Sequence, residues 1–179
     1  MNDNPLIQSL KEICLFLDSI ETEYMLVGGL AVGIWSQPRA TVDIDLLVTI
    51  MPADLETFMN ELRKSNKFIF IHDAPMSFKK ISLIRATLKG NPDIFVDFIL
   101  ADDDFKIEAL KRREQVELAD FTINITTPED LIILKLLSDR EQDRLDAKMI
   151  LETQKGRLDL EYIRKWLNRL GVEIEGIKL

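Results

Sequence analysis

The sequence predicts an α/β (α+β) fold, with a mixed central β-sheet, flanking helices and a helical C-terminal portion. Two observations indicate it. Residues 41–49 alternate polar and apolar side chains, which is typical of a half-buried strand. From Thr127 onward apolar residues recur at helical spacing instead, after a capping threonine and Pro128 at the first helical position. We therefore expect an α/β domain over residues 1–125 and a helical portion packed on it over residues 126–179.

The remaining elements follow from local signals in chain order. Asn4 and Pro5 predict the start of an amphipathic first helix that continues to Ile20. A short buried strand over 24–27 runs directly into two glycines, and a short helix follows over 30–35. Further along we expect a helix over 54–64, strands over 67–71 and 81–88, a turn over 90–93, a strand over 94–100, a helix over 104–113 and a strand over 121–125.

Composition excludes several classes of protein. The chain has 179 residues, 46% of them hydrophobic, which is enough for a real core. A formal net charge of -8 opposes a general nucleic-acid coat protein. The single cysteine, Cys14, and the single histidine, His72, rule out an internal disulfide, a cysteine zinc cluster and a dyad of two imidazoles. Without a signal peptide or an apolar run of membrane length, we expect a cytoplasmic protein with no membrane partner.

Two aspartates, Asp43 and Asp45, lie two positions apart on the most clearly predicted strand. Because side chains alternate along a strand, both leave the same face, about 7 Å apart. Paired carboxylates raise each other's pKa unless a cation lies beside them, and hard oxygen ligands suit Mg²⁺. We therefore expect a metal site. The alternative is a solvent-facing pair on a polar face, which Leu47 on that same face disfavours.

A third aspartate, Asp97, interrupts a predicted strand that is otherwise apolar on both faces, as a central strand is. A buried unpaired carboxylate costs several kcal/mol, so Asp97 needs a partner. If its strand lies beside the strand of Asp43 and Asp45, a shared metal ion is that partner. The alternative is a salt bridge to Arg39 or Arg85.

The glycine pair Gly28 and Gly29 lies where a predicted strand turns into a helix. Such a turn offers free backbone N–H groups and the positive end of a helix dipole to a phosphate. The alternative is a tight turn that binds nothing, since neither a G-x-G-x-x-G nor a Walker A pattern is present. Thirteen residues separate Gly29 from Asp43, enough for a helix and a loop that returns the glycines to the carboxylates.

The three segments VGGLAVGIW, RATVDIDLLV and FVDFIL together resemble the signature of the polymerase β-type nucleotidyltransferase superfamily. That signature is a strand-end Gly-Gly or Gly-Ser, a spacer, Asp-x-Asp and a later strand aspartate. The chain looks most like the small branch of AbiEii-type and minimal nucleotidyltransferases of toxin–antitoxin and abortive-infection systems, which is related to the antibiotic nucleotidyltransferases. The segment TPEDLIILKLLSDREQDRLDAKMIL also resembles the helical region of that branch, so the resemblance covers about residues 24–151.

This resemblance implies a polymerase β-type fold and a metal-dependent enzyme. The enzyme would transfer a nucleoside monophosphate, by default AMP from ATP, from an NTP to a hydroxyl and release pyrophosphate. Asp43, Asp45 and Asp97 would hold two Mg²⁺ ions, with Mn²⁺ as a substitute, and Asp97 would also activate or orient the acceptor hydroxyl. Gly28 and Gly29 would bind the triphosphate, although many relatives carry a serine at the second of these positions.

Four further residues have two interpretations each. Arg39 and Thr41 precede the carboxylate strand and either contact phosphates or order the loop. By resemblance Lys135 approaches the nucleotide phosphates and Asp146 orients it. The alternative is a solvent-exposed, salt-bridged face of one helix, formed by Lys135, Asp139, Asp143 and Asp146. A separate basic stripe faces RNA, an acidic partner or only solvent, and consists of Arg140, Arg144 and Lys148.

The sequence does not select the acceptor. A tRNA end, a protein side chain and a small-molecule antibiotic all carry suitable hydroxyls, and the acidic net charge weighs mildly against RNA. The resemblance also implies a partner toxin or antitoxin protein. Two other functions compete with transfer. One is a non-catalytic, antitoxin-like binding module that retains the fold, and the other is a metal-dependent phosphohydrolase that releases orthophosphate.

Overall fold

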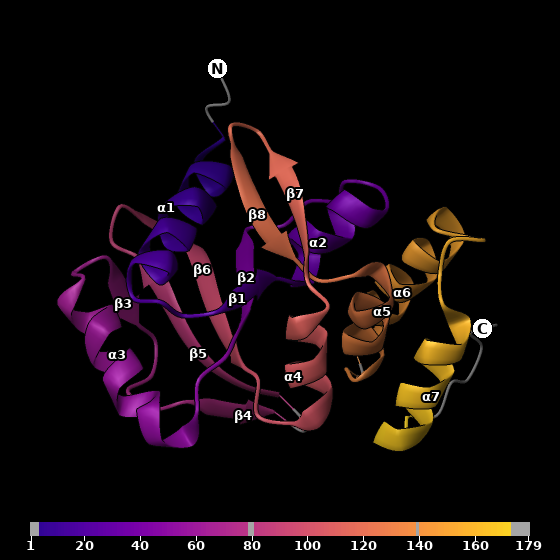
Figure 1. The fold of residues 1–179 in the computed structure, drawn as a ribbon. Helices are drawn as coiled ribbons and strands as arrows, with labels where there is room; N and C mark the ends of the chain where they lie inside the picture. The colour runs from indigo at the N-terminus through magenta and orange to yellow at the C-terminus, as the bar shows by residue number, and fades with distance from the viewer. Residues whose placement is uncertain (1–3, 79–80, 139, 173–179) are drawn as a thin grey trace.

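The computed structural model describes residues 4–78, 81–138 and 140–172. Its centre is an eight-stranded mixed sheet in the order β3-β5-β6-β2-β1-β8-β7, with β4 paired to β5 beside β3 (Figure 1). The pairs β2–β6 and β1–β8 are parallel and the others are antiparallel. The strands are β1 Tyr24–Leu26, β2 Asp43–Val48, β3 Phe68–Phe70, β4 Met76–Phe78, β5 Ile81–Leu88, β6 Asn91–Leu100, β7 Glu114–Leu118 and β8 Phe121–Ile125.

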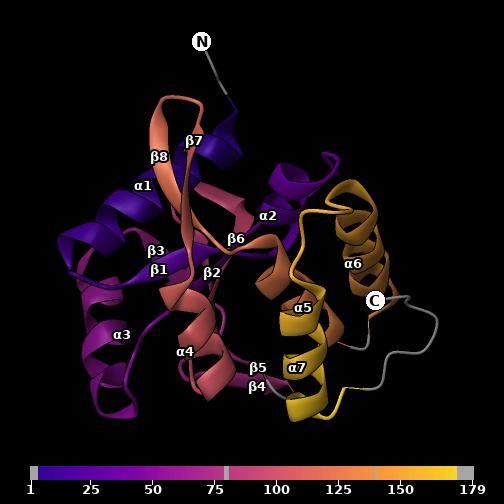
Figure 2. The ribbon, with the colours of Figure 1, turned by 45° about the vertical axis from the view of Figure 1, so that its right-hand side comes forward.

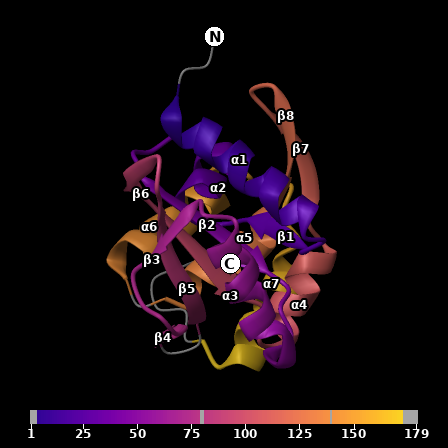
Figure 3. The same cartoon turned by 90° about the vertical axis from the view of Figure 1, so that its left-hand side faces the viewer.

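Helices flank this sheet on both sides, which confirms the predicted fold class (Figures 1 and 3). They are α1 Pro5–Ser19, α2 Gly28–Trp35, a 3₁₀ turn Pro52–Asp54, α3 Leu55–Lys64, α4 Asp104–Lys111, α5 Pro128–Leu136, α6 Glu141–Thr153 and α7 Leu160–Leu170. Helices α1 and α3 lie on one side. Figure 2 shows α2, α5, α6 and α7 gathered on the other side, where α5 contacts the other three.

The helix starts form as their capping residues predict. The Asn4 side chain accepts a hydrogen bond from the Leu6 N–H at 3.0 Å, and Pro5 occupies the first helical position of α1. The Thr127 hydroxyl likewise accepts from the Asp130 N–H at 3.2 Å at the start of α5. Each cap satisfies a backbone donor that has no partner inside its own helix.

Two strands and one turn differ from expectation. Strands β4 and β7 were not predicted, because both are short, largely exposed edge strands in which only two apolar residues alternate. The turn before β6 is confined to residues 89–90, so the expected turn over 90–93 is wrong. Pro92 is tolerated in β6 because the ladder to β2 begins only at Phe95.

The alternation of side chains along β6 decides which residues face the core. Phe98 packs edge-on against Phe58 of α3 and Phe68 of β3, with ring centroids 5.7 and 5.5 Å away. Asp97 therefore points to the opposite face of the sheet, away from α3. No helix among the described residues combines the length and apolar character that crossing a bilayer requires.

Candidate active site

A row of three charged side chains crosses the middle of the sheet. Arg85 on β5 is paired in register with Asp97 on β6, and Asp97 is paired in register with Asp45 on β2. Asp43 lies two residues before Asp45 on the same face, beside Phe95. Neighbouring strands are about 4.8 Å apart, so the three predicted carboxylates gather on one face of two adjacent parallel strands.

Asp97 is buried and forms an ion pair with Arg85. The Arg85 Nε donates to Asp97 Oδ1 at 2.7 Å and its Nη2 donates to Oδ2 at 2.5 Å, so the ion pair is bidentate. The hydrogen bond to Asp97 raises the pKa of Arg85, and the charges of Asp97, Asp43 and Asp45 raise it further. Of the two arginines considered from the sequence, Arg85 is therefore the partner of Asp97, whereas Arg39 pairs elsewhere.

Asp45 lies directly against the glycine turn. The Val27 N–H donates to the Asp45 carbonyl oxygen at 2.9 Å, and the chain then enters α2 at Gly28 with a φ of 65°. A Cβ atom at Gly28 would lie 1.8 Å from Asp45 Oδ2, so only glycine fits here. The predicted strand, glycine turn and helix are confirmed, and the helix begins two residues earlier than expected.

The carboxyl group of Asp45 has a raised pKa. Burial raises its pKa to about 6, and the nearby charges of Asp97 and then Asp43 also raise it. The Lys135 charge and a backbone hydrogen bond from Gly29 act in the opposite direction. A cation placed beside Asp45 would therefore be favourable.

The donor chemistry of this cluster fits Mg²⁺, because all three side chains offer hard carboxylate oxygens. Within the described ranges, however, no three acidic, histidine or cysteine side chains are already gathered as a metal-ligand set. Asp97 gives both of its oxygens to Arg85. Asp43 and Asp45 are the half-buried carboxylates of the cluster.

The loop before β2 folds back over the glycine turn. A Cβ atom at Gly29 would lie 2.9 Å from Arg39 Nη2 and 3.0 Å from Thr41 Oγ1. Arg39 Nη2 also donates to Asp146 at 3.1 Å, while its buried Nε has no hydrogen-bond partner in the part of the chain that is described. Thr41 accepts from the Asp43 N–H at 3.4 Å. Both residues thus order the loop, and Arg39 retains an unused donor beside Gly29.

Lys135 is buried, so the interpretation as a solvent-exposed helix face is wrong. Its Nζ lies 2.7 Å from Asp143 Oδ1 and 2.8 Å from Asp146 Oδ2. The prediction that these residues form a stripe on one helix is also wrong, because α5 ends at Leu136 and α6 begins at Glu141. Lys135 bridges the two helices across their contact.

Arg140 belongs to the same cluster, which the sequence did not indicate. Its Nε donates to Asp143 Oδ2 at 2.6 Å, and this bond, together with the charges of Asp143, Asp45 and Asp146, raises its pKa. Arg140 is the N-cap residue of α6, so Arg144 and Lys148 follow it on the same helix, but its side chain pairs with Asp143. Asp139 lies outside the described residues.

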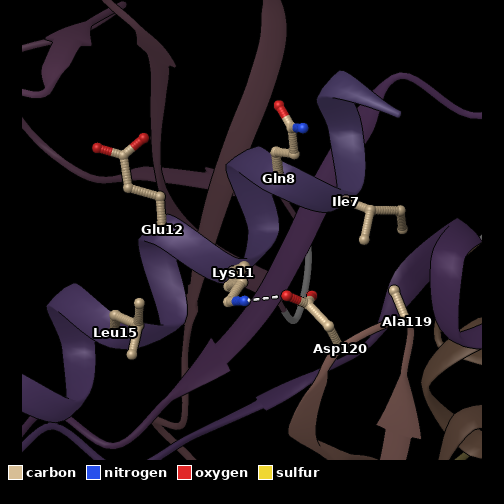
Figure 4. A pocket seen from close by; sticks show the side chains of 7 residues that line it. All are labelled: Ile7, Gln8, Lys11, Glu12, Leu15, Ala119 and Asp120. Atoms are coloured by element: carbon tan, nitrogen blue, oxygen red, sulfur yellow. Dashed lines mark hydrogen bonds and ion pairs between the residues drawn. The ribbon is translucent and has the colours of Figure 1, made fainter. Parts of the chain in front are cut away.

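A pocket of about 740 Å³ lies elsewhere, between α1 and the β7–β8 turn (Figure 4). An ion pair between Lys11 Nζ and Asp120 Oδ2 at 2.5 Å crosses it, and Leu15 lies exposed at its margin. None of the predicted site residues lines this pocket. It is therefore separate from the carboxylate cluster.

One family of known proteins matches most of this chain. Residues 14–165 match the family described as the nucleotidyl transferase AbiEii toxin of a type IV toxin–antitoxin system. No curated protein sequence matches the chain significantly.

Three solved structures share the fold at low sequence identity. The antibiotic-resistance factor ANT(2'')-Ia has a TM-score of 0.63 and 11% identity, covering 94% of each chain. A Thermotoga maritima protein described as a nucleotidyltransferase has a TM-score of 0.55 and 16% identity, and the match covers 94% of this chain and 96% of that one. The lincosamide antibiotic adenylyltransferase LnuA, bound to lincomycin, has a TM-score of 0.54 and 15% identity, covering 82% of this chain and 96% of its own.

Proposed function

The chain belongs to the AbiEii family of nucleotidyl transferases, and we propose that it transfers a nucleoside monophosphate from an NTP, by default ATP, to an acceptor hydroxyl with release of pyrophosphate. One observation carries this proposal. The glycine turn at Gly28 touches Asp45, and Asp97 lies in register on the next strand. A glycine turn of a kind suited to phosphate and a carboxylate cluster therefore meet at one point of the sheet, which supports the proposal.

The nucleotide side of the site is formed by α2, α5 and the loop before β2. The Val27 side chain does not cap α2, and beyond the Gly29 N–H, which bonds to Asp45, the first N–H groups of the helix are suitable for phosphate oxygens. Arg39 lies against Gly29 with a donor to spare, and the charge of Lys135 reaches Asp45. We assign Gly28, Gly29, Arg39, Thr41 and Lys135 to the triphosphate, with Asp146 holding Lys135 and Arg39 in place.

The acceptor approaches from the side of Asp97. In this proposal Asp97 accepts the proton of the acceptor hydroxyl or orients that hydroxyl. Asp43, Asp45 and Asp97 would hold two Mg²⁺ ions, or Mn²⁺ in their place. When bound, these ions neutralise the charge that develops on the transferred phosphoryl group and on the leaving pyrophosphate.

The family supports a role in a toxin–antitoxin or abortive-infection system, with a partner protein encoded by the same system. ANT(2'')-Ia is an antibiotic-resistance factor and LnuA is an antibiotic adenylyltransferase, which supports a small-molecule antibiotic as one acceptor class. A tRNA end and a protein side chain are the other two classes. Each presents a hydroxyl that the same chemistry can use.

Transfer is tested by incubating the protein with α-labelled NTPs, Mg²⁺ or Mn²⁺, and each acceptor class in turn. We expect label on one acceptor and stoichiometric pyrophosphate, and we expect both to be lost in Asp43→Asn and Asp97→Asn. The exposed Asp120→Asn, on the β7–β8 turn, is the matched control and should keep full activity. Orthophosphate in place of pyrophosphate would indicate a phosphohydrolase.

Nucleotide binding is tested independently of the acceptor by thermal unfolding. An NTP at 100 times its Kd stabilises the native state by about 2.7 kcal/mol, which raises Tm by roughly 5–10 °C for a chain of this length. We expect this protection to require a divalent cation and to disappear in Asp45→Asn. Absence of protection by every NTP would instead favour the antitoxin-like binding module.

A further inference from the structure

Asp97 has two oxygens, and Arg85 occupies both. The two contacts are 2.7 and 2.5 Å long, and the Asp97 side chain is only 6% exposed. A guanidinium held on both oxygens takes up a lone pair of each and offsets the negative charge of the carboxylate, so Asp97 is a weaker metal ligand in this arrangement than a free carboxylate is. As the site stands, Asp43 and Asp45 are the acidic ligands open to a cation.

We propose that Arg85 competes with a divalent cation for Asp97, so that the nucleotide-free protein binds one such cation and the second is admitted only when Arg85 leaves. This inference rests on the proposed function, because it assumes that the three carboxylates take up metal ions. It adds a positioning role for Arg85, which neither the family description nor the sequence pattern assigns.

The charges of the cluster support a single cation in the resting state. On strands β2, β5 and β6, three ionised carboxylates and one guanidinium leave two formal negative charges, which one divalent cation balances. The nearby charges of Lys135 and Arg140 are paired with Asp143 and Asp146. Releasing Asp97 from Arg85 leaves a third negative charge on the same face, since Asp97 and Asp45 are neighbours in register. A second divalent cation then becomes favourable, and the surplus positive charge suits a polyphosphate.

The geometry indicates that Arg85 is the group that moves. Its side chain is 37% exposed, against 6% for Asp97, and its guanidinium lies 5.6 Å from the Phe95 ring at the margin of the site. A long, partly exposed arginine can change rotamer while the strand carrying Asp97 stays in place. The phosphates of a bound nucleotide are an anion able to draw the guanidinium away.

The test measures Mn²⁺ binding by calorimetry and electron paramagnetic resonance, without any acceptor. For the wild-type protein without nucleotide we expect one bound Mn²⁺. For Arg85→Gln we expect two, with the second bound at least tenfold more tightly than in the wild type. The double variant Arg85→Gln/Asp97→Asn should lose this gain, because the gain needs the freed carboxylate.

Adding a non-hydrolysable ATP analogue provides a second readout. The wild-type protein should then bind two Mn²⁺ ions, while the count for Arg85→Gln should not change. Arg63→Gln is the matched control, since Arg63 lies over the Phe70 ring on α3 at the other face of the sheet, and its Mn²⁺ binding should equal that of the wild type.

The outcomes separate the two proposals. If Arg85→Gln binds Mn²⁺ with the wild-type count and affinity, the competition is refuted while the metal site stands. If no variant binds Mn²⁺, with or without nucleotide, the proposed function fails as well. Should Arg85→Gln not fold, Arg85→Lys replaces it, because lysine keeps the charge but cannot hold both oxygens, and its second Mn²⁺ should bind with intermediate affinity.

Discussion

At the scale of one residue, both the backbone conformation and the close packing at position 28 require glycine. The Gly28 φ of 65° is a conformation that costs other residues about 1–2 kcal/mol, and a Cβ atom there would overlap Asp45 Oδ2. The other glycines that the structure describes meet only one of these conditions or neither. They therefore provide controls.

We expect Gly28→Ala to displace the Asp45 side chain and to abolish nucleotide-dependent thermal protection. Gly171→Ala, at a φ of 65° with open space around it, should cost about 1 kcal/mol of stability without affecting nucleotide binding. Gly90→Ala should be neutral within about 0.5 kcal/mol. Urea denaturation and calorimetry with ATP measure both properties. Normal nucleotide protection in Gly28→Ala would contradict the close contact with Asp45.

Asp45 should make the stability of the metal-free protein depend on pH. Its pKa is about 6 in the folded state against 3.8 in the unfolded state, so between these values the native state holds more protons. The contribution of Asp45 to stability is therefore full below pH 4 and is lost as pH rises through 6. The loss corresponds to about 3 kcal/mol.

We expect Asp45→Asn to raise the unfolding free energy of the metal-free protein at pH 7.5 by about 2–3 kcal/mol, and to have little effect at pH 4. Urea titrations at several pH values give this difference. The control is Asp120→Asn, whose carboxyl pKa is lowered by Lys11 and which should change stability in the opposite direction. An equal effect of Asp45→Asn at both pH values would show that the carboxyl is not perturbed by burial.

At the scale of elements, the contact between α5 and α6 depends on one buried lysine. Lys135 pairs with Asp143 and Asp146, and Asp146 in turn holds Arg39 on the loop over the glycine turn. A single charge network thus joins two C-terminal helices to the nucleotide side of the site. Removing one member leaves others buried and unpaired.

We expect Lys135→Met to destabilise the protein by about 3–5 kcal/mol. The double variant Lys135→Met/Asp143→Asn should cost less than the sum of the two single variants, because it removes one of the orphaned charges. Chemical denaturation of all four proteins gives the coupling energy. Lys148→Met, on the exposed face of α6, is the control and should be nearly neutral. Additive effects would indicate that Lys135 is not coupled to Asp143.

At the scale of the whole molecule, the change of periodicity near residue 125 does not interrupt the core. Apolar side chains from both parts of the chain pack in one cluster. The Trp35 Nε1 donates to the Thr126 carbonyl at 2.8 Å, and the Gln154 side chain donates to the Trp35 carbonyl at 2.6 Å. These two hydrogen bonds therefore hold the C-terminal end of α2 against the helical portion.

We expect the complete chain to unfold in one cooperative transition and residues 1–126 alone to remain unfolded. In the native chain Leu131, Ile132 and Ile133 of α5 are fully inaccessible to solvent. Truncation would remove these side chains and expose the apolar surface of residues 1–126 against which they pack. Circular dichroism during urea denaturation and the amide dispersion of the fragment in NMR spectra test this. A folded fragment would instead support two independent domains separated near residue 125.

Much of the site was predictable because its signals are local. Alternation along one strand placed Asp43 and Asp45 on the same face, and the apolar run around Asp97 indicated a central strand. The helix starts at Pro5 and Pro128 followed from capping residues directly before them. Each of these features depends on residues within one turn or one strand.

The sequence by itself thus determined the strand, glycine turn and helix, the paired aspartates and the resemblance to nucleotidyltransferases. Only the tertiary structure decided that Asp97 pairs with Arg85, that α5 and α6 are separate helices bridged by Lys135, and that Arg140 joins the site. The physical reason is the distance along the chain over which each interaction acts. Capping and periodicity act between neighbours in the chain, whereas the partner of a buried charge depends on the register of strands and helices that meet only in the folded protein.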